Sequence, residues 1–334
     1  MNKFQPEITI LIPVRNVAKY IRGCLDALLA QDYPKEKIKI WILDNSSSDG
    51  TPGIVAEYKN RGVDIFQMGV DPPAKKYNLI WPKIETEFIG LVDGDAYVSR
   101  DWLKNVIAPL AEEGVAGASG LIKTENPEKL FAKLVGYDWQ DRCERSTKNV
   151  KRVPCMHTVY KKKAIDEIGG FNELLKTGYD VDLGYRLTKA GHKIRYVPEA
   201  VTYHCHRDNF ISWWKQQYEY AKFALKRYLM IPENVLGDSF APWWVILQPA
   251  YYALVLALFA LSMVFGWPWW LFLVPMSFLF ILYIFQSARI AVRYSDPFGF
   301  FVIILYIVRP IIWSIGAFVM VVIIIRNLAR NRAD

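Results

Sequence analysis

Residues 88–95 read FIGLVDGD, a short apolar run that ends in two acids flanking a glycine. Apolar runs of this length are typical of strands buried on both faces of a parallel sheet. Two similar runs precede it, ITILI at 8–12 and IKIWIL at 38–43, and residues 18–30 between them have helical spacing. Strands that alternate with helices predict an α/β domain with a mixed, mainly parallel sheet flanked by helices.

Polar side chains follow the predicted strands where each one ends. They are, in chain order, Arg15, Asn16, Asp44, Asp93 and Asp95, and Pro13 stands at the end of the first strand. Sheets of this kind bind ligands beyond the carboxyl ends of their strands. Two carboxylates around a glycine can hold a hard divalent cation that bridges phosphates, although Asp-Gly-Asp is also a common turn sequence.

The sequence contains neither GxGxxG nor GxxxxGK[ST], which disfavours a dinucleotide dehydrogenase and a P-loop enzyme. Without such a loop, a metal ion and basic side chains must neutralise any bound phosphates. Lys75 and Lys76, close before Asn78, are candidates, and a solvated pair of charges is the alternative.

A second group of candidates lies further along the chain. Asp180, between Tyr179 and Asp182, stands near the predicted start of a helix that continues to Ala190. A helix N-terminus favours an ionised carboxylate, which can act as a general base, but first-turn acids are also common without that role. His204 follows a predicted strand at 193–197 and is a candidate metal ligand or a structural histidine.

The last part of the chain has a different composition. Residues 239–334 carry six arginines, no lysine and two acids. The uncharged segments 243–265 and 267–285 are each long enough to cross a bilayer core of about 30 Å. We therefore expect three regions, which are a catalytic domain at 1–208, an amphipathic interface helix and linker at 209–238, and a transmembrane domain at 239–334.

The third apolar segment, 298–325, contains Arg309 and Pro310. A proline kinks a helix, and a charge at membrane depth is costly. Three crossings would place Arg326, Arg330 and Arg332 opposite the catalytic domain, whereas positive residues prefer the cytoplasmic side. We expect three membrane segments, with a re-entrant or kinked third segment as the alternative.

The N-terminus shows no signal peptide, which predicts a cytoplasmic catalytic domain on a multi-pass cell-membrane protein. Aromatic and basic residues alternate at helical spacing over 210–231, as suits a membrane interface, and a core-facing helix is the alternative. The net charge of +8 arises largely from 201–334 and does not indicate nucleic-acid binding. The four scattered cysteines predict no disulfide framework.

Seven segments in order between residues 8 and 204 resemble the inverting glycosyltransferases of family 2, which have the GT-A fold. They are ITILIPVRN, WILDNSSSDGT, YNLI, FIGLVDGDAYVSRDWL, IGGFNE, YDVDLGYRL and YVPEAVTYH. The resemblance covers about residues 6–208. It implies a nucleotide-sugar donor linked to UDP or GDP and direct displacement with inversion.

The resemblance also implies roles for individual residues. Pro13, Arg15 and Asp44 would hold the nucleotide base, Asp93 would contact the nucleotide, and Asp95 and His204 would ligate Mg²⁺ or Mn²⁺. Asp180 would be the catalytic base, with Tyr179 standing where the family usually has Glu. Asn16, Lys75, Lys76 and Asn78 join the expected donor side, and Tyr179 and Asp182 the expected acceptor side.

The anchor favours transfer of one sugar to a lipid-linked or membrane-proximal glycan. The alternatives are a polyprenyl-phosphate sugar synthase, a processive polysaccharide synthase and a nucleotide-sugar-binding membrane scaffold. No Gln-x-x-Arg-Trp motif follows Asp180, which disfavours the processive enzyme. The basic segment 142–163 could approach anionic headgroups or an acceptor diphosphate. The alternative is a solvated loop and strand edge. Sequence leaves the oligomeric state open.

Overall fold

The computed structural model describes residues 4–268, 270 and 273–330. The chain divides into two compact units. Unit 1 comprises residues 1–125 and 142–205, and unit 2 comprises 126–141 and 206–334. The sequence did not indicate that 126–141 belong to the second unit.

Unit 1 is built on one sheet of nine strands among the described residues. The strand order is β3-β2-β1-β4-β8-β6-β9-β5, and β7 pairs with β9. The strands are β1 Ile8–Val14, β2 Ile38–Asp44, β3 Val63–Gln67, β4 Phe88–Val92, β5 Ala96–Val98, β6 Val115–Thr124, β7 Asn149–Val150, β8 His157–Lys161 and β9 Lys193–His204. The runs expected at 8–12, 38–43 and 88–92 are strands.

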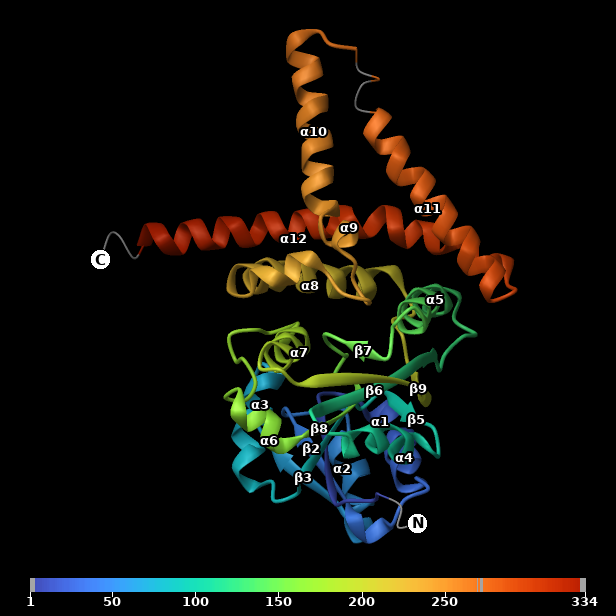
Figure 1. Ribbon diagram of the computed structural model, residues 1–334, viewed down its shortest axis with the longest axis vertical. Coiled ribbons are helices and arrows are strands. Elements are labelled where there is room, and N and C mark those ends of the chain that lie inside the picture. The colour runs from blue at the N-terminus through green and yellow to red at the C-terminus, as the bar shows by residue number, and fades with distance from the viewer. Residues whose placement is uncertain (1–3, 269, 271–272, 331–334) are drawn as a thin grey trace. The chain divides into compact units, whose positions relative to one another are not determined.

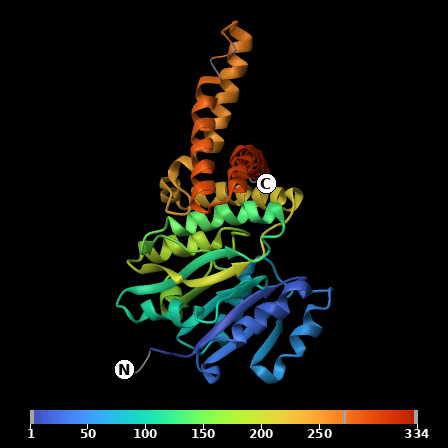
Figure 2. The same cartoon turned by 90° about the vertical axis from the view of Figure 1, so that its right-hand side faces the viewer.

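The first four strands form the parallel half of this sheet (Figures 1 and 2). β1 is buried along nearly its whole length and pairs with β2 on one side and β4 on the other. Its register places Val14 opposite Asp44. The remaining strands make the sheet mixed, since β8 is antiparallel to β4 and β6. The expected fold class is thereby confirmed.

Helices connect and flank these strands. In unit 1 they are α1 Ala18–Leu29, α2 Thr51–Ala56, α3 Pro73–Ile80, α4 Trp102–Ile107, α6 Lys162–Glu167 and α7 Tyr179–Lys189, with short 3₁₀ turns at 35–37, 59–61, 81–83 and 108–111. The buried face of α1, with Ile21, Cys24, Leu25 and Leu28, packs in the same core cluster as β1. Burial of this apolar area drives formation of the layer.

Unit 2 is helical. Its helices are α5 Leu130–Glu144, whose last three residues belong to unit 1, α8 Phe210–Met230, α9 Trp243–Ile246, α10 Gln248–Phe265, α11 Leu273–Arg293 and α12 Val302–Arg330, with 3₁₀ turns at 232–236 and 297–301. The helix expected at 210–231 is α8. The side chain of Asn209 accepts a hydrogen bond from the Ser212 N–H at 2.9 Å and thereby caps α8.

Three helices of unit 2 are long and apolar enough to cross a membrane, and they cover Gln248–Phe265, Leu273–Arg293 and Pro297–Asn327. The second ends eight residues beyond the expected residue 285. Its expected segment includes residues 269, 271 and 272, which lie outside the described residues, as does Arg332. Pro310 lies within α12, which continues through it as one helix.

Arg309 of α12 is buried and paired with Asp138 of α5, with 2.6 Å between Arg309 Nη2 and Asp138 Oδ2. The guanidinium also lies within 6 Å of the ring centres of Trp213, Tyr306 and Trp313. A buried charge is stable only when it is paired and hydrogen-bonded. Arg309 therefore holds α12 against α5.

Removing one member of this pair should destabilise unit 2 more than removing both. Arg309→Gln or Asp138→Asn alone leaves one charge buried, at a cost of about 3–5 kcal/mol. The double variant should cost clearly less than the sum of the two single variants. Denaturant unfolding of the full chain in detergent, followed by tryptophan fluorescence, measures these differences.

Asp32→Asn provides the control, since the Asp32–Lys104 pair is exposed on both sides. Loss of this exposed pair should lower the free energy of unfolding by less than about 1 kcal/mol. Strictly additive effects of the Arg309 and Asp138 variants would contradict the assigned coupling.

Candidate active site

Asp93, Asp95 and His204 bring their ligand atoms within 4.8 Å of one another. The two acids follow β4, and His204 is the last residue of β9. β5 pairs antiparallel with β9 so that Ala96 lies opposite His204. His204 Nε2 consequently lies 3.3 Å from Asp95 Oδ1. The cluster is therefore formed by segments more than a hundred residues apart in the sequence.

The chemistry of these three side chains fits a divalent cation. Carboxylate oxygens are the ligands that Mg²⁺ and Mn²⁺ prefer, and imidazole is a common additional ligand. Each of the three residues is partly exposed, so an ion can reach them from solvent. Two carboxylates this close repel each other, and a cation between them offsets that repulsion.

Gly94, between the two acids, packs closely against the end of β1 and the start of the next helix. A Cβ at this position would lie 3.0 Å from Val14 Cγ1 and 3.4 Å from Val17 Cγ2. A side chain here would require the Val14 and Val17 side chains to move by a few tenths of an ångström. The glycine between the acids thus allows the turn to pack tightly against the end of the neighbouring strand.

Asp44, at the end of β2, is fully buried. Its carboxylate accepts hydrogen bonds from the hydroxyl and the backbone N–H of Ser47. Asn16 follows β1, adopts a positive φ of 55° and also hydrogen-bonds this loop, accepting from the Ser48 N–H at 2.9 Å. The ends of β1, where Pro13 lies, and β2 are therefore tied together.

Asp71 connects the basic candidates of this edge. Its carboxylate lies 3.7 Å from Arg15 Nη1 and 3.7 Å from Lys76 Nζ, and it accepts from the Asn45 side-chain amide at 3.0 Å. Lys76 is almost completely buried, and burial lowers the pKa of its ammonium. Lys75 lies on the same helix, half-buried. Arg15 and Lys76 are thus brought together beside Asp44.

Two other candidate residues support the neighbouring turn. The Asn78 side chain accepts from the Phe171 N–H at 2.9 Å and donates to the Phe171 C=O at 2.8 Å. Asp182 is buried, and its carboxylate accepts from Arg186 at 2.7 Å and from Asn172 at 3.2 Å. Both side chains engage residues 171–186 and hold the turn that precedes α7.

Asp180 lies in the first turn of α7, whose N-cap Gly178 has a positive φ of 74°. Tyr179 packs edge-on against Tyr77 and Phe171, with ring centres 6.1 and 6.4 Å away. Burial first, and then neighbouring groups that include Asp93 and Asp180, raises the pKa of Tyr77 and of Tyr179. Asp93 and Asp180 therefore lie in one neighbourhood, around the same two tyrosines.

Comparison with known proteins agrees with this geometry. Residues 9–169 match the family described as Glycosyl transferase family 2. The chain carries a family 2 glycosyltransferase domain.

A pre-mycofactocin glycosyltransferase of Mycobacterium tuberculosis is 29% identical over 219 residues, which are 62% of this chain and 44% of that protein. A beta-monoglucosyldiacylglycerol synthase of Trichormus variabilis is 26% identical over 252 residues, 70% of this chain and 53% of that protein. The chain thus spans about half the length of these two relatives.

A solved structure of a mannosyltransferase from Pyrobaculum calidifontis, in complex with GDP-Man and Mn²⁺, superimposes with a TM-score of 0.64 at 19% identity. The superposition covers 93% of this chain and 88% of that one. It shows that the glycosyltransferase domain has the GT-A fold expected from the sequence.

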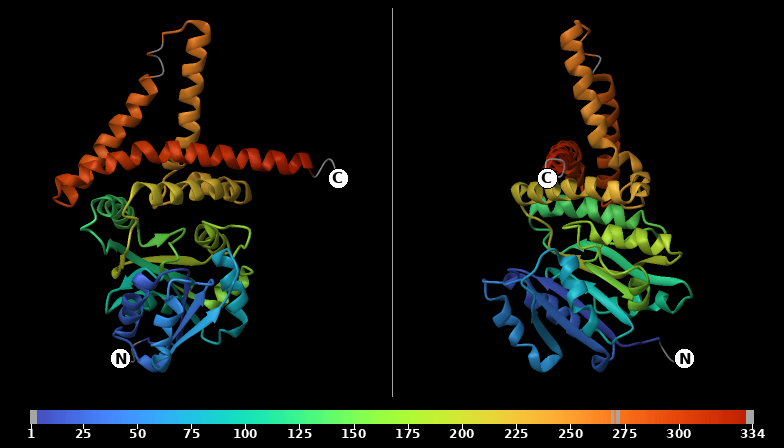
Figure 3. Two further views of the ribbon diagram at one scale, coloured as in Figure 1. Left: turned by 180° about the vertical axis from the view of Figure 1, so that it is seen from behind. Right: turned by 90° about the vertical axis from the view of Figure 1, so that its left-hand side faces the viewer.

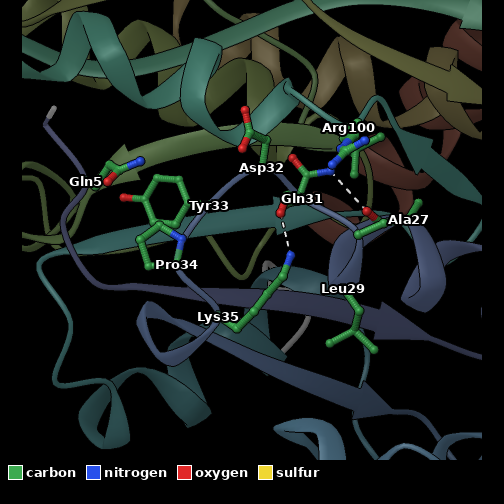
Figure 4. Close-up of a pocket in the computed structure, with 11 residues that line it drawn as sticks. Gln5, Ala27, Leu29, Gln31, Asp32, Tyr33, Pro34, Lys35 and Arg100 are labelled. Carbon is green, nitrogen blue, oxygen red and sulfur yellow. Dashed lines mark hydrogen bonds between the residues drawn. The ribbon is translucent and has the colours of Figure 1, made fainter.

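The glycosyltransferase domain also contains an open pocket of about 770 Å³ at the other edge of its sheet (Figure 4). Its lining includes Gln5, before β1, and Tyr33 and Lys35, before β2. Gln31 also lines the pocket, and its backbone C=O accepts a hydrogen bond from the Lys35 ammonium. These residues flank the amino ends of the strands, so the pocket is separate from the candidate site at the carboxyl ends.

Sequence reasoning missed Asp71, Asn45 and His157. Asp71 stands in a loop with no recognisable motif, and Asn45, although within the segment WILDNSSSDGT, was not singled out; the fold joins Asn45 to Asp71 and Asp71 to Lys76. His157, at the start of β8, is fully buried and its Nδ1 lies 3.0 Å from Thr202 Oγ1. The preceding residue, Met156, accepts a hydrogen bond from the Asp93 N–H through its C=O. His157 thus directly follows the residue that hydrogen-bonds the backbone of Asp93.

Asp95→Asn should weaken binding of Mn²⁺ and of the metal-dependent nucleotide, because one charged ligand is lost. We expect a decrease of about tenfold or more in affinity. Titration calorimetry of Mn²⁺ with UDP or GDP measures it, with Asp64→Asn, an exposed acid of β3, as the control. Unchanged Mn²⁺ affinity in Asp95→Asn would refute the metal role.

Acidification should lower the stability of the folded protein through the buried His157. Burial, with a smaller effect of His204, lowers its pKa from the ordinary 6.5 to about 3. Between these values the unfolded chain binds a proton that the folded chain does not, so stability is lost as the pH falls. At about pH 4.5 this loss is about 2–3 kcal/mol, at about 1.4 kcal/mol per unit.

His157→Gln should therefore lose less stability than the wild type between about pH 6.5 and 4.5. The measurement compares the unfolding free energies of the two proteins at both pH values. Equal losses would show that His157 does not titrate as assigned.

Proposed function

We propose that this protein is a membrane-bound inverting glycosyltransferase. It transfers one sugar from a nucleotide-diphosphate sugar to a lipid-linked or membrane-proximal glycan, and it requires Mg²⁺ or Mn²⁺. The observation that carries the proposal is the cluster of Asp93, Asp95 and His204 at one edge of a GT-A sheet, and the influence of both Asp93 and Asp180 on Tyr77 and Tyr179 supports a role for Asp180 in the same site.

The donor side of the site would suit a nucleoside diphosphate. Asp44 and Arg15 follow neighbouring strands and would bind the nucleotide base together with Pro13, next to the loop that Asn16 and Ser47 order. Lys76, held by Asp71, lies on the same edge and would face the phosphates with Lys75. The mannosyltransferase of similar fold was solved with GDP-Man, and UDP and GDP donors both remain candidates.

Asp95 and His204 would hold the metal ion, and Asp93 would contact the nucleotide beside it. When bound, the ion would act as a Lewis acid that neutralises charge on the departing diphosphate. Two carboxylates and one imidazole suit Mn²⁺, which accompanies the sugar nucleotide in the mannosyltransferase structure, as well as Mg²⁺.

Asp180 would remove the proton of the acceptor hydroxyl. The acceptor oxygen then forms a bond to the anomeric carbon while the bond from that carbon to the diphosphate oxygen breaks. The nucleoside diphosphate leaves with the bonding electrons, and the configuration inverts. Tyr179, in place of the usual acid, would present an aromatic ring to the acceptor beside the base.

The acceptor proposed is carried by a lipid. Unit 2 supplies helices long and apolar enough to cross a membrane, and one relative is named a beta-monoglucosyldiacylglycerol synthase. We place the protein in the cell membrane with its glycosyltransferase domain on the cytoplasmic side. A lipid-borne acceptor would then reach Asp180 by diffusion in the membrane.

The proposal is tested by incubating the purified full chain with a panel of UDP and GDP sugars, Mn²⁺ and a membrane lipid extract. Transfer of one sugar to a lipid from one donor is expected. Asp180→Asn should lower kcat by about a hundredfold or more, because general-base catalysis is lost, while nucleotide binding stays near that of the wild type.

Asp166→Asn, which alters an acid on α6, serves as the control and should retain activity. A product of many sugars would indicate the processive enzyme. A sugar phosphate of a polyprenol, formed at equal rates with and without Asp180, would indicate the polyprenyl-phosphate synthase and refute the base. Nucleotide binding with no turnover under any condition would favour the scaffold.

A further inference from the structure

Helix α12 has the length and hydropathy of a membrane-spanning segment, yet it carries Arg309 in its first third. Whether it crosses decides on which side of the membrane the C-terminal arginines lie. The contacts that α12 makes within unit 2 answer this question.

The first contact is the pair between Arg309 and Asp138 of α5, which requires both helices to lie at the same depth relative to the membrane here. Asp138 lies on a helix that also carries Lys133 and Asp141, and Asp141 accepts from Arg289 of α11 at 2.6 Å. A helix with this many charges is too polar for the hydrocarbon core of a bilayer. Arg309 therefore lies in the polar layer.

The second set of contacts joins about one turn of α12 to α8. Trp313 Nε1 donates to Gln217 Oε1 at 3.1 Å. Gly316 approaches α8 so closely that a Cβ there would lie 2.8 Å from Ala221 Cβ and 2.9 Å from the Tyr218 carbonyl oxygen. The residue numbers of the contacting partners increase together along the two helices. The helices therefore run side by side in the same direction.

Helix α8 is itself a polar helix. It carries Lys215, Glu219, Lys222, Lys226 and Arg227 within its 21 residues. A Cβ at Gly316 of α12 would be 3.2 Å from the backbone nitrogen of Lys222. Because α8 cannot enter the hydrocarbon core, α12 stays in the polar layer at least as far as Gly316.

Too few residues follow Gly316 for a crossing. Residues 317–327 extend about 16 Å at about 1.5 Å per residue, against a hydrocarbon core of about 30 Å. Figure 3 agrees with this reading, since its right panel views α12 end-on where α10 and α11 are seen lengthwise.

The face of α12 that these contacts leave open is apolar. Its exposed large side chains include Ile304, Ile311, Ile315, Phe318 and Ile325. Their spacings of seven, four, three and seven residues place them along one stripe of the helix. Such a stripe on a helix held in the polar layer suits the surface of a lipid monolayer.

We infer that α12 lies in the membrane surface, with its apolar stripe in the lipid monolayer next to unit 1, and does not cross. The chain then crosses twice, through α10 and α11, and Arg326 lies on the same side as the glycosyltransferase domain. This arrangement satisfies the preference of arginines for the cytoplasmic side, which three crossings would violate.

The test is sided labelling of single cysteines in the full chain, in sealed membrane vesicles of each orientation. Cys205, the natural cysteine that is not buried, is first replaced by serine. Lys59→Cys reports the side of unit 1, Trp267→Cys the turn after α10, and Asn327→Cys the end of α12. A membrane-impermeant maleimide should label positions 59 and 327 in the same vesicles, and position 267 in the opposite ones.

Labelling of position 327 together with 267 would overturn the inference, as would labelling only after detergent is added. Trypsin treatment of the unsubstituted chain gives an independent measurement. Cleavage after Arg326 should occur only in vesicles that expose unit 1, and cleavage in the opposite vesicles would overturn the inference. Neither measurement requires activity, so failure here is distinguishable from failure of the proposed transfer.

Discussion

The parallel pairing of β1 with β2 and β4 is the constraint on which the candidate site depends. Parallel strands in register end at the same edge, so residues with no relation in the sequence meet there. The pairing of Val14 with Asp44, and of Leu11 with Leu91 in the middle of the sheet, fixes this edge. The antiparallel β5–β9 pair then brings His204 to the acids from another part of the chain.

The sequence allowed prediction of what depends on local pattern. Buried strands such as β1 and β4 read as continuous apolar runs, and the acids that follow them could be placed from the general geometry of parallel sheets. Asp71 could not, because its role arises from contacts with Arg15 and Lys76 across two loops. His157 likewise became visible only through burial, since an isolated histidine in a strand carries no signal of its surroundings.

The same limit applied to the membrane part. The apolar segments were evident from composition, but the meaning of Arg309 depended on a carboxylate in α5, 171 residues away. Asp138 had no distinguishing pattern in a helix that reads as an ordinary polar one. Hydropathy records how apolar a segment is, whereas its orientation depends on which polar groups of other helices it contacts.

The two acids of α5 have a consequence for how the chain assembles. Asp138 and Asp141 are synthesised well before Arg309 and Arg289, their partners in α12 and α11, which follow 171 and 148 residues later. Until those helices have been made, neither carboxylate has its arginine partner, so α5 cannot reach its final packing during early synthesis. Completion of unit 2 therefore waits until α11 and α12 have both been synthesised.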